Sequence, residues 1–264
     1  MLTEKQKKEI ASLNRRKNRE QQNVFLVEGI RSVDTALESV AEVRFLISTS
    51  ATHSPERDSR AESLGGIAAT LSESEMAKIS DVRNSQGLLL VAARPWSDPD
   101  DLLSQNSILI LDGVQDPGNV GTLLRTAAWF GVDAVLAGPE TADFFNAKVV
   151  RASMGGIWDV QLAYTDDLSA WCSAWTGAER YLYAADLDGQ ALDDWLPTFP
   201  SALIVGSEAR GISEVLAPFI IERIYVPSSP ARSEEQYPRN RATESLNAAV
   251  AGALVISSWV RQIG

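Results

Sequence analysis

The stretch of sequence that decides the fold is SILILDGVQDPGNVGTLLRTA, residues 107–127. It opens with a continuous apolar run at 108–111, which is typical of a strand buried on both faces of a sheet. A turn at Asp116–Asn119 separates this strand from a predicted helix, whose apolar face is Val120, Leu123, Leu124 and Ala127. Gly131 is suited to end this helix, because glycine readily adopts the left-handed conformation. This order of elements predicts a parallel α/β sheet.

The same alternation continues toward the C-terminus. A stretch at 94–101, rich in Pro, Asp and Ser, marks a domain boundary. We expect a first domain at residues 1–96, a linker at 97–106 and a second domain at 107–264. In the second domain, further strands are predicted at 133–137, 158–164, 179–185, 202–206 and 224–227, with a helix at 146–154 and a long closing helix that has Ser245 as its N-cap.

The first domain is also predicted to be α/β. Its expected helices cover residues 4–13, 30–39 and 72–79, its strands cover 23–29, 43–48 and 88–93, and residues 14–19 form a basic, turn-prone stretch. The sequence contains no run of about 18 apolar residues, so no membrane span is predicted. The polar first twenty residues do not resemble a signal peptide.

The composition excludes several kinds of site. Cys172 is the single cysteine and His53 the single histidine among 264 residues. Neither an internal disulfide nor a cysteine- or histidine-rich metal site is therefore possible, and no metal is expected. A reducing cytoplasm is the expected compartment.

The charge is unevenly distributed. The net charge of the chain is −11, which by itself argues against a nucleic-acid partner. Residues 1–31, however, carry eight basic and four acidic side chains, so this segment is +4 and the remainder −15. A basic arm on an acidic body can bind RNA through its local field. The alternative is a solvated amphipathic helix, and composition alone leaves both open.

Three loops follow predicted strands at their carboxyl ends, where ligands bind in parallel sheets. They lie at residues 111–127, at 204–212 and at 225–227 continued by 244–251. None contains the Gly-Lys-Ser/Thr ending of a phosphate loop or the Gly-x-Gly-x-x-Gly pattern of dinucleotide-binding folds. The sequence therefore does not support an ordinary nucleotide-binding fold, because neither motif is present in these loops.

Together, these three loops resemble the SpoU/TrmH family of RNA ribose 2′-O-methyltransferases, within the SPOUT class, over residues 107–262. The link at 148–156 is also similar to that family. Residues 25–31, preceded by the basic residues 15–17, look like the family's substrate-binding domain, which resembles a small ribosomal-protein RNA-binding fold. The resemblance implies a deep trefoil knot, a homodimer and S-adenosylmethionine as the cofactor, and the ribosomal RNA branch is the most similar.

The resemblance also assigns site residues. The expected contacts to S-adenosylmethionine are Gly206, Val226 and Leu246, with Gly211 shaping its loop. The expected catalytic set is Arg125, Asn119, Glu208, Ser245 and Asn247. We expect Arg125 to clamp an RNA phosphate and polarise the hydroxyl, because an arginine acting as a base would need an unusually low pKa. The expected RNA-phosphate contacts are Arg15, Arg16, Lys17 and Arg31.

Each of these residue types also has a simpler structural explanation. Arg125 could form an ion pair on a helix surface, and Asn119, Ser245 and Asn247 could cap helices. Glu208 could orient Arg125, orient the third loop, or be a solvated charge. A polar insertion at 228–243 replaces the family's short turn. It is either an RNA-contacting lid, through Arg232, Tyr237, Arg239 and Arg241, or a tolerated insertion.

The sequence thus predicts an S-adenosylmethionine-dependent RNA ribose 2′-O-methyltransferase acting on large-subunit ribosomal RNA. One alternative is a transfer-RNA methyltransferase. The other is a non-catalytic RNA-binding or ribosome-assembly factor, against which the complete set of polar site residues argues.

Overall fold

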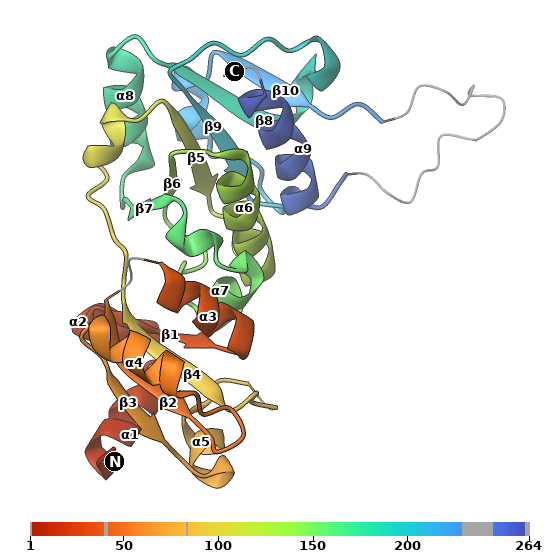
Figure 1. Cartoon of the computed structure of the whole chain (residues 1–264). Coiled ribbons are helices and arrows are strands. Elements are labelled where there is room, and N and C mark those ends of the chain that lie inside the picture. Colours follow the sequence, from red (N-terminus) through yellow and green to blue (C-terminus); the bar gives the residue numbers. More distant parts are fainter. Residues whose placement is uncertain (1, 40–41, 83, 229–244, 262–264) are drawn as a thin grey trace, which may run out of the picture. The chain divides into compact units, whose positions relative to one another are not determined.

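The computed structural model describes residues 2–39, 42–82, 84–228 and 245–261. The chain divides into two compact units (Figure 1): residues 1–96 with 143–159, and residues 97–142 with 160–264. The α/β class predicted for both parts of the sequence is confirmed. Among the described residues, no helix combines the length and apolarity needed to cross a membrane.

The first unit is built on a four-stranded mixed sheet of order β1-β4-β2-β3. β4 pairs antiparallel with β1 and β2, and β2 pairs parallel with β3. Its elements are α1 (Glu4–Ser12), α2 (Arg16–Gln22), β1 (Val24–Glu28), α3 (Ile30–Glu38), β2 (Val43–Ser48), α4 (Pro55–Ser63), β3 (Ile67–Thr70), α5 (Glu73–Ile79), β4 (Leu88–Ala93), α7 (Ala147–Ser153) and the 3-10 turn η2 (Gly156–Trp158).

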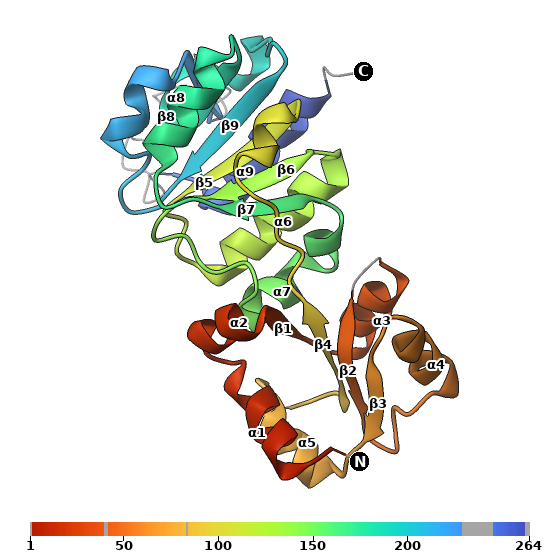
Figure 2. The same ribbon diagram turned by 90° about the vertical axis from the view of Figure 1, so that its left-hand side faces the viewer.

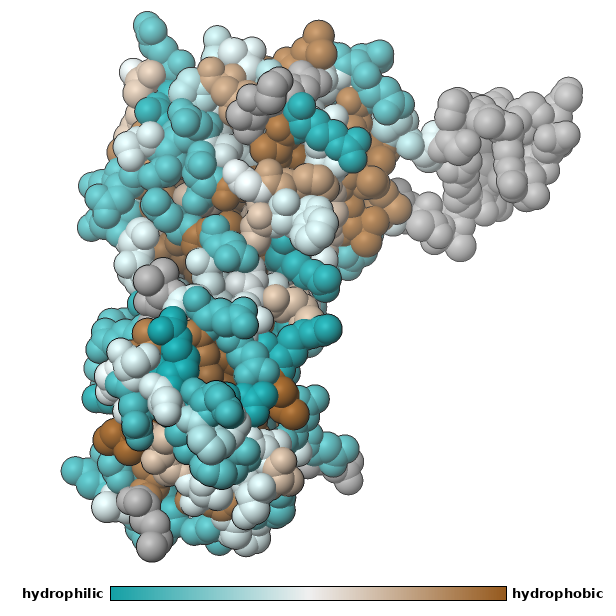
Figure 3. Space-filling model, in the orientation of Figure 1, coloured by the Kyte–Doolittle hydropathy of each residue, from teal (hydrophilic) through white to brown (hydrophobic). Residues whose placement is uncertain are grey.

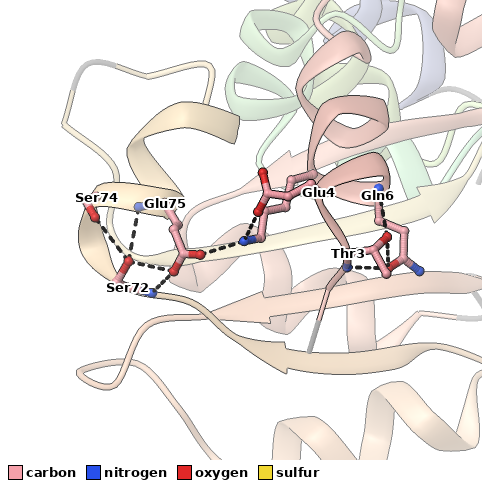
Figure 4. A network of polar contacts seen from close by, with 7 residues as sticks. Thr3, Glu4, Gln6, Ser72, Ser74 and Glu75 are labelled. Carbon is pink, nitrogen blue, oxygen red and sulfur yellow. Dashed lines mark hydrogen bonds and ion pairs between the residues drawn. The ribbon is translucent and has the colours of Figure 1, made fainter.

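Helices α1 and α5 are joined by a partly buried polar network (Figure 4). Lys7 Nζ donates to Glu4 Oε1 at 2.8 Å and to Glu75 Oε1 at 2.6 Å. Ser72 caps α5 in a capping box with Glu75, as the sequence predicts. These contacts hold the pKa of Glu75 down at about 2, with the Lys7 hydrogen bond as the largest cause.

Residues 143–159 belong to the first unit, although they lie within the range predicted for the second domain. Their aromatic rings pack on Phe25 of β1: the Phe145 centroid is 4.9 Å away and that of Trp158 is 5.4 Å away. The buried Arg19 guanidinium also pairs with Asp143, at 2.5 Å. These long-range contacts leave no periodic signal in the sequence.

The second unit is a six-stranded, all-parallel sheet of order β10-β8-β9-β5-β6-β7. Helices α6 and α9 lie on one face and α8 on the other (Figures 1 and 2). Its elements are η1 (Asp101–Ser104), β5 (Ser107–Asp112), α6 (Pro117–Phe130), β6 (Ala134–Ala137), β7 (Gln161–Tyr164), α8 (Leu168–Gly177), β8 (Tyr181–Ala191), η3 (Leu192–Asp194), β9 (Ser201–Gly206), η4 (Glu214–Phe219), β10 (Glu222–Tyr225) and α9 (Ala248–Val260).

Several predicted elements differ from the observed ones. Residues 16–19, expected as a turn, begin α2. The Asn18 and Arg19 side chains donate to the carbonyls of Ser12, the last residue of α1, and of Leu13, its C-cap. The strand expected from 158 begins only at Gln161, after η2. In the segment expected as a linker, Leu102 of η1 is fully buried in the core of the second unit.

Candidate functional site

The carboxyl edge of the parallel sheet brings the first two predicted loops together. From β5 the chain continues to β6 on one side, whereas β9 lies against β5 on the other. The strand order therefore switches between β5 and β9, and their last residues, Asp112 and Gly206, are paired in register. Ligands in parallel α/β sheets bind at such a switch point.

Glu208 joins all three loops. Its Oε1 accepts hydrogen bonds from Asn119 Nδ2 and Asn247 Nδ2, each at 2.8 Å, and from the backbone N–H of Ala248 at 3.2 Å. Asn247 Nδ2 also donates to Asn119 Oδ1 at 3.1 Å. The carboxylate lies at the first turn of α9, where a helix favours negative charge. The structure thus brings Asn119, Glu208 and Asn247 into one cluster.

Of the three residues considered as helix caps, Asn247 caps a helix, whereas Asn119 and Ser245 do not. Asp116, not Asn119, is the N-cap of α6: its Oδ1 accepts from the N–H groups of Gly118 at 2.7 Å and Asn119 at 3.0 Å. Asn247, not Ser245, is the N-cap of α9. The prediction of Ser245 as N-cap was therefore wrong, because the helix starts two residues later than expected. Asn119 is left free to point its amide at Glu208.

Gly206 and Gly211 close the loop after β9. Ser207 and Gly211 exchange two backbone hydrogen bonds, at 3.0 and 2.8 Å. A Cβ on Gly206 would lie 2.5 Å from the carbonyl carbon and oxygen of Gly211, so a side chain there would displace backbone. Gly211 has φ +67°, a left-handed conformation that favours glycine, and a Cβ there would meet nothing within 4 Å. The loop is therefore closed tightly at Gly206, and space is left only beside Gly211.

Val226 and Leu246 belong to the same edge. Val226 follows β10, which is parallel to β8, and β8 is parallel to β9. With about 4.8 Å between neighbouring strands, Gly206 and Val226 leave the sheet two strands apart. Leu246 is 46% exposed and immediately precedes Asn247. Leu246 therefore lies next to the Glu208 cluster, and Val226 leaves the sheet at the same edge.

Arg125 is not part of this cluster. It is exposed on α6, six residues and about 9 Å of helix rise beyond Asn119. Within the described ranges, no hydrogen bond or ion pair involves its guanidinium, so the surface ion pair considered as an alternative is not formed there. The structure also does not support orientation of Arg125 by Glu208, whose bonds go to the other two loops.

A cavity of about 490 Å³ lies at the carboxyl ends of β5, β6 and β7, and Gly211 is the one predicted site residue on its wall. Two wall contacts were missed by sequence reasoning. Asp112 accepts from the N–H and hydroxyl of Ser213, at 2.6 and 3.0 Å. Arg210 pairs with Glu140, which lowers the pKa of that carboxyl. The position of Asp112, directly after the buried apolar run 108–111, could have identified it as a residue at the carboxyl edge of the sheet.

The predicted RNA contacts are on the surface of the first unit. Arg15, Arg16, Lys17 and Arg31 are all exposed. Arg16 Nε pairs with Glu20 at 2.7 Å, whereas Arg19 is buried in its contact with Asp143. Within the described ranges, no group of three or more His, Cys, Asp or Glu side chains is placed to hold a metal ion.

Comparison with known families matches both parts of the chain. Residues 106–257 match the SpoU rRNA methylase family. Residues 5–90 match the MRM3-like substrate-binding domain.

Individual relatives extend over nearly the full length. A protein of Bacillus subtilis named 23S rRNA (guanosine(2553)-2′-O)-methyltransferase RlmP is 32% identical over 257 residues, covering 94% of this chain and 93% of its own. A putative RNA methyltransferase of the TrmH family from Porphyromonas gingivalis has a TM-score of 0.82 and 36% identity, covering 99% of both chains. An AdoMet-bound rRNA methyltransferase from Sinorhizobium meliloti has a TM-score of 0.83 and 25% identity, covering 100% of this chain and 97% of its own.

Proposed function

Since the chain belongs to the SpoU rRNA methylase family, we propose that it transfers a methyl group from S-adenosylmethionine to a ribose 2′-hydroxyl of large-subunit ribosomal RNA. The observation that carries this proposal is the Glu208 cluster, which ties three sequence-distant loops together at the switch point of a parallel sheet. The Bacillus subtilis relative is named for 2′-O-methylation of 23S rRNA, and the same substrate class is proposed for this chain.

The residues at the sheet edge fit the cofactor. Glycine at positions 206 and 211 lets an adenine edge approach the loop backbone closely, and Val226 and Leu246 supply apolar contacts to its ring. When bound, S-adenosylmethionine supplies an electrophilic methyl group. The AdoMet-bound Sinorhizobium meliloti structure supports the assignment of this cofactor.

The chain's own groups then position the RNA. The amides of Asn119 and Asn247, held by Glu208, orient the ribose near the methyl group, and Ser245 adds a hydroxyl beside them. Glu208 acts as a positioning residue. Arg125, with no partner in the described part of the chain, clamps a phosphate with its planar fork and polarises the attacking hydroxyl. As the oxygen–carbon bond forms, the sulfur–carbon bond would break and the hydroxyl proton would pass to solvent water.

The first unit holds the substrate RNA. Its match to a substrate-binding domain supports this role, as do the exposed side chains of Arg15, Arg16, Lys17 and Arg31. Structured RNA is bound there by shape, phosphate and 2′-hydroxyl contacts. Residues 229–244, which include the cations of the predicted lid, lie outside the described residues.

The active form is a homodimer with a knotted second unit. An exposed apolar surface supports the dimer: Trp129 of α6 is 83% exposed, and Val250 and Leu254 of α9 are 49% and 44% exposed. Apolar side chains gather along α9 (Figure 3). A second copy of the chain would remove this surface from water. The family resemblance supports the knot, and the cytoplasm remains the predicted compartment.

The proposal is tested by mass spectrometry of ribosomal and transfer RNA from cells with and without this protein. The expected result is one 2′-O-methylated nucleotide of large-subunit ribosomal RNA that disappears with the gene and returns with the wild-type protein. Loss of a transfer-RNA methylation instead would establish the alternative substrate. Unchanged methylation of both RNAs would contradict the proposal.

A further inference from the structure

Trp96 of the first unit is exposed but held in place. Its side chain is 40% exposed. The centroid of its ring lies 5.6 Å from that of Phe145 and 6.4 Å from that of Phe144, with tilted geometry in both cases. A partly exposed ring that its neighbours already hold in place loses little conformational freedom when a base stacks on its exposed part.

Arg94 lies over the same aromatic group. Its guanidinium carbon is 5.0 Å from the Trp96 centroid and 4.7 Å from that of Phe145. Its Nε is buried and has no hydrogen-bond partner in the described structure. Burial lowers the pKa of this guanidinium, although arginine stays charged at neutral pH. The cation is thus held by two rings, and its two terminal nitrogens, which are not among the buried atoms and have no hydrogen bond within the described residues, remain available to an anion.

The acids near Arg94 already have other partners. Asp143 pairs with Arg19 at 2.5 Å, and Glu20 pairs with Arg16 at 2.7 Å. Both pairs involve α2, whose last residue is followed by Asn23, and the backbone N–H of Arg94 donates to the Asn23 carbonyl at 3.1 Å. The positive charge of Arg94 therefore has no counter-charge of its own and lies beside the basic helix α2.

We propose that Trp96 and Arg94 form a binding site for one unpaired nucleotide of the substrate RNA, with the base stacked on the Trp96 ring and a phosphate on the Arg94 guanidinium. Unpaired bases in RNA commonly stack on aromatic rings, and the planar fork of arginine suits a phosphate. This site rests on the proposed function, because it takes RNA as the substrate. It adds a base contact to the phosphate contacts proposed for Arg15, Arg16, Lys17 and Arg31.

Two RNA probes separate this role from plain packing: a hairpin with an unpaired loop, and a fully paired duplex of equal length. Trp96→Leu is expected to weaken hairpin binding about 5- to 100-fold, the range for losing one stacked base, and to leave duplex binding unchanged. Trp96→Phe keeps a ring and is expected to stay within about threefold of wild type. Ile67→Ala, at another exposed apolar residue of the first unit, is the matched control.

Arg94→Lys keeps the charge but loses the planar fork, so it is expected to weaken hairpin binding as well, with Arg44→Lys as the exposed control. Hairpin affinity equal to wild type in a folded Trp96→Leu protein would overturn this inference and leave the proposed function intact. An equal loss for hairpin and duplex would also overturn it. Wild-type protein that bound neither RNA would contradict the proposed function itself.

Discussion

The two units stabilise their functional surfaces differently. In the second unit, one carboxylate ties three loops together at the edge of a sheet, and a glycine closes one of them too tightly to accept a methyl group. In the first unit, the candidate RNA contacts are separate exposed cations on α2 and α3. A site that aligns reacting atoms needs fixed geometry, whereas a polyanion is held by charge that tolerates displacement. Substitutions should therefore have large effects in one unit and graded effects in the other.

The largest effect is expected from Arg125→Ala. Removing the phosphate clamp should lower turnover by about 10²-fold or more, because a preorganised charge at the reaction centre is lost. Binding of S-adenosylmethionine should not change, since Arg125 lies outside the Glu208 cluster. Steady-state methyl transfer and calorimetry measure the two quantities. Turnover close to wild type would remove Arg125 from the catalytic set.

Gly206→Ala tests the rigidity of the second unit. The new Cβ would meet the Gly211 carbonyl at 2.5 Å, so the loop backbone must move. We expect affinity for S-adenosylmethionine to fall at least about tenfold, as expected when one or two well-placed hydrogen bonds are lost. Gly177→Ala is the matched control, because a Cβ there meets nothing within 4 Å. Equal affinities for the two variants would show that the loop after β9 does not bind the cofactor.

Removing the cations of α2 should have a smaller and salt-dependent effect. For the Arg15→Ala, Lys17→Ala double variant, the slope of log affinity for RNA against log salt concentration should become shallower by about 1 to 2. Because Arg16 is paired with Glu20 at 2.7 Å, we expect it to contribute less to RNA affinity than Arg15 or Lys17. Filter binding at several salt concentrations measures the slope, with Arg44→Ala as control. An unchanged slope would identify α2 as a solvated helix, the alternative that the composition left open.

The smallest effect concerns the polar network between α1 and α5. Because the pKa of Glu75 is about 2 in the folded chain against an ordinary 4.5, its contribution to stability is present above pH 4.5 and is lost as the pH falls toward 2. Glu75→Gln should therefore lower the urea midpoint slightly at pH 6, and the difference from wild type should shrink by pH 3. A difference that does not change with pH would assign the effect to packing.

Much of the second unit could be predicted because its strands are continuous apolar runs, such as 108–111, and its glycines mark turns. The Asn119–Glu208–Asn247 cluster could be predicted only as a set of residues, through family resemblance. Its hydrogen bonds depend on a strand order that places β9 beside β5. Nothing local in the sequence marks Asp143–Asp159 as part of the first unit, because Phe25 and Phe145 meet across 120 residues of chain. For the same reason, the contacts of Trp96 with Phe144 and Phe145 could not be predicted from the sequence.

The central claim is that three separated loops form one cofactor site, and calorimetry of the purified protein with S-adenosylmethionine in the absence of RNA tests it most directly. We expect saturable binding with one site per chain, weakened in the Glu208→Ala variant, in which the third loop is no longer tied to the other two. Absence of binding to the folded wild-type protein, or equal affinity in Glu208→Ala, would contradict the claim.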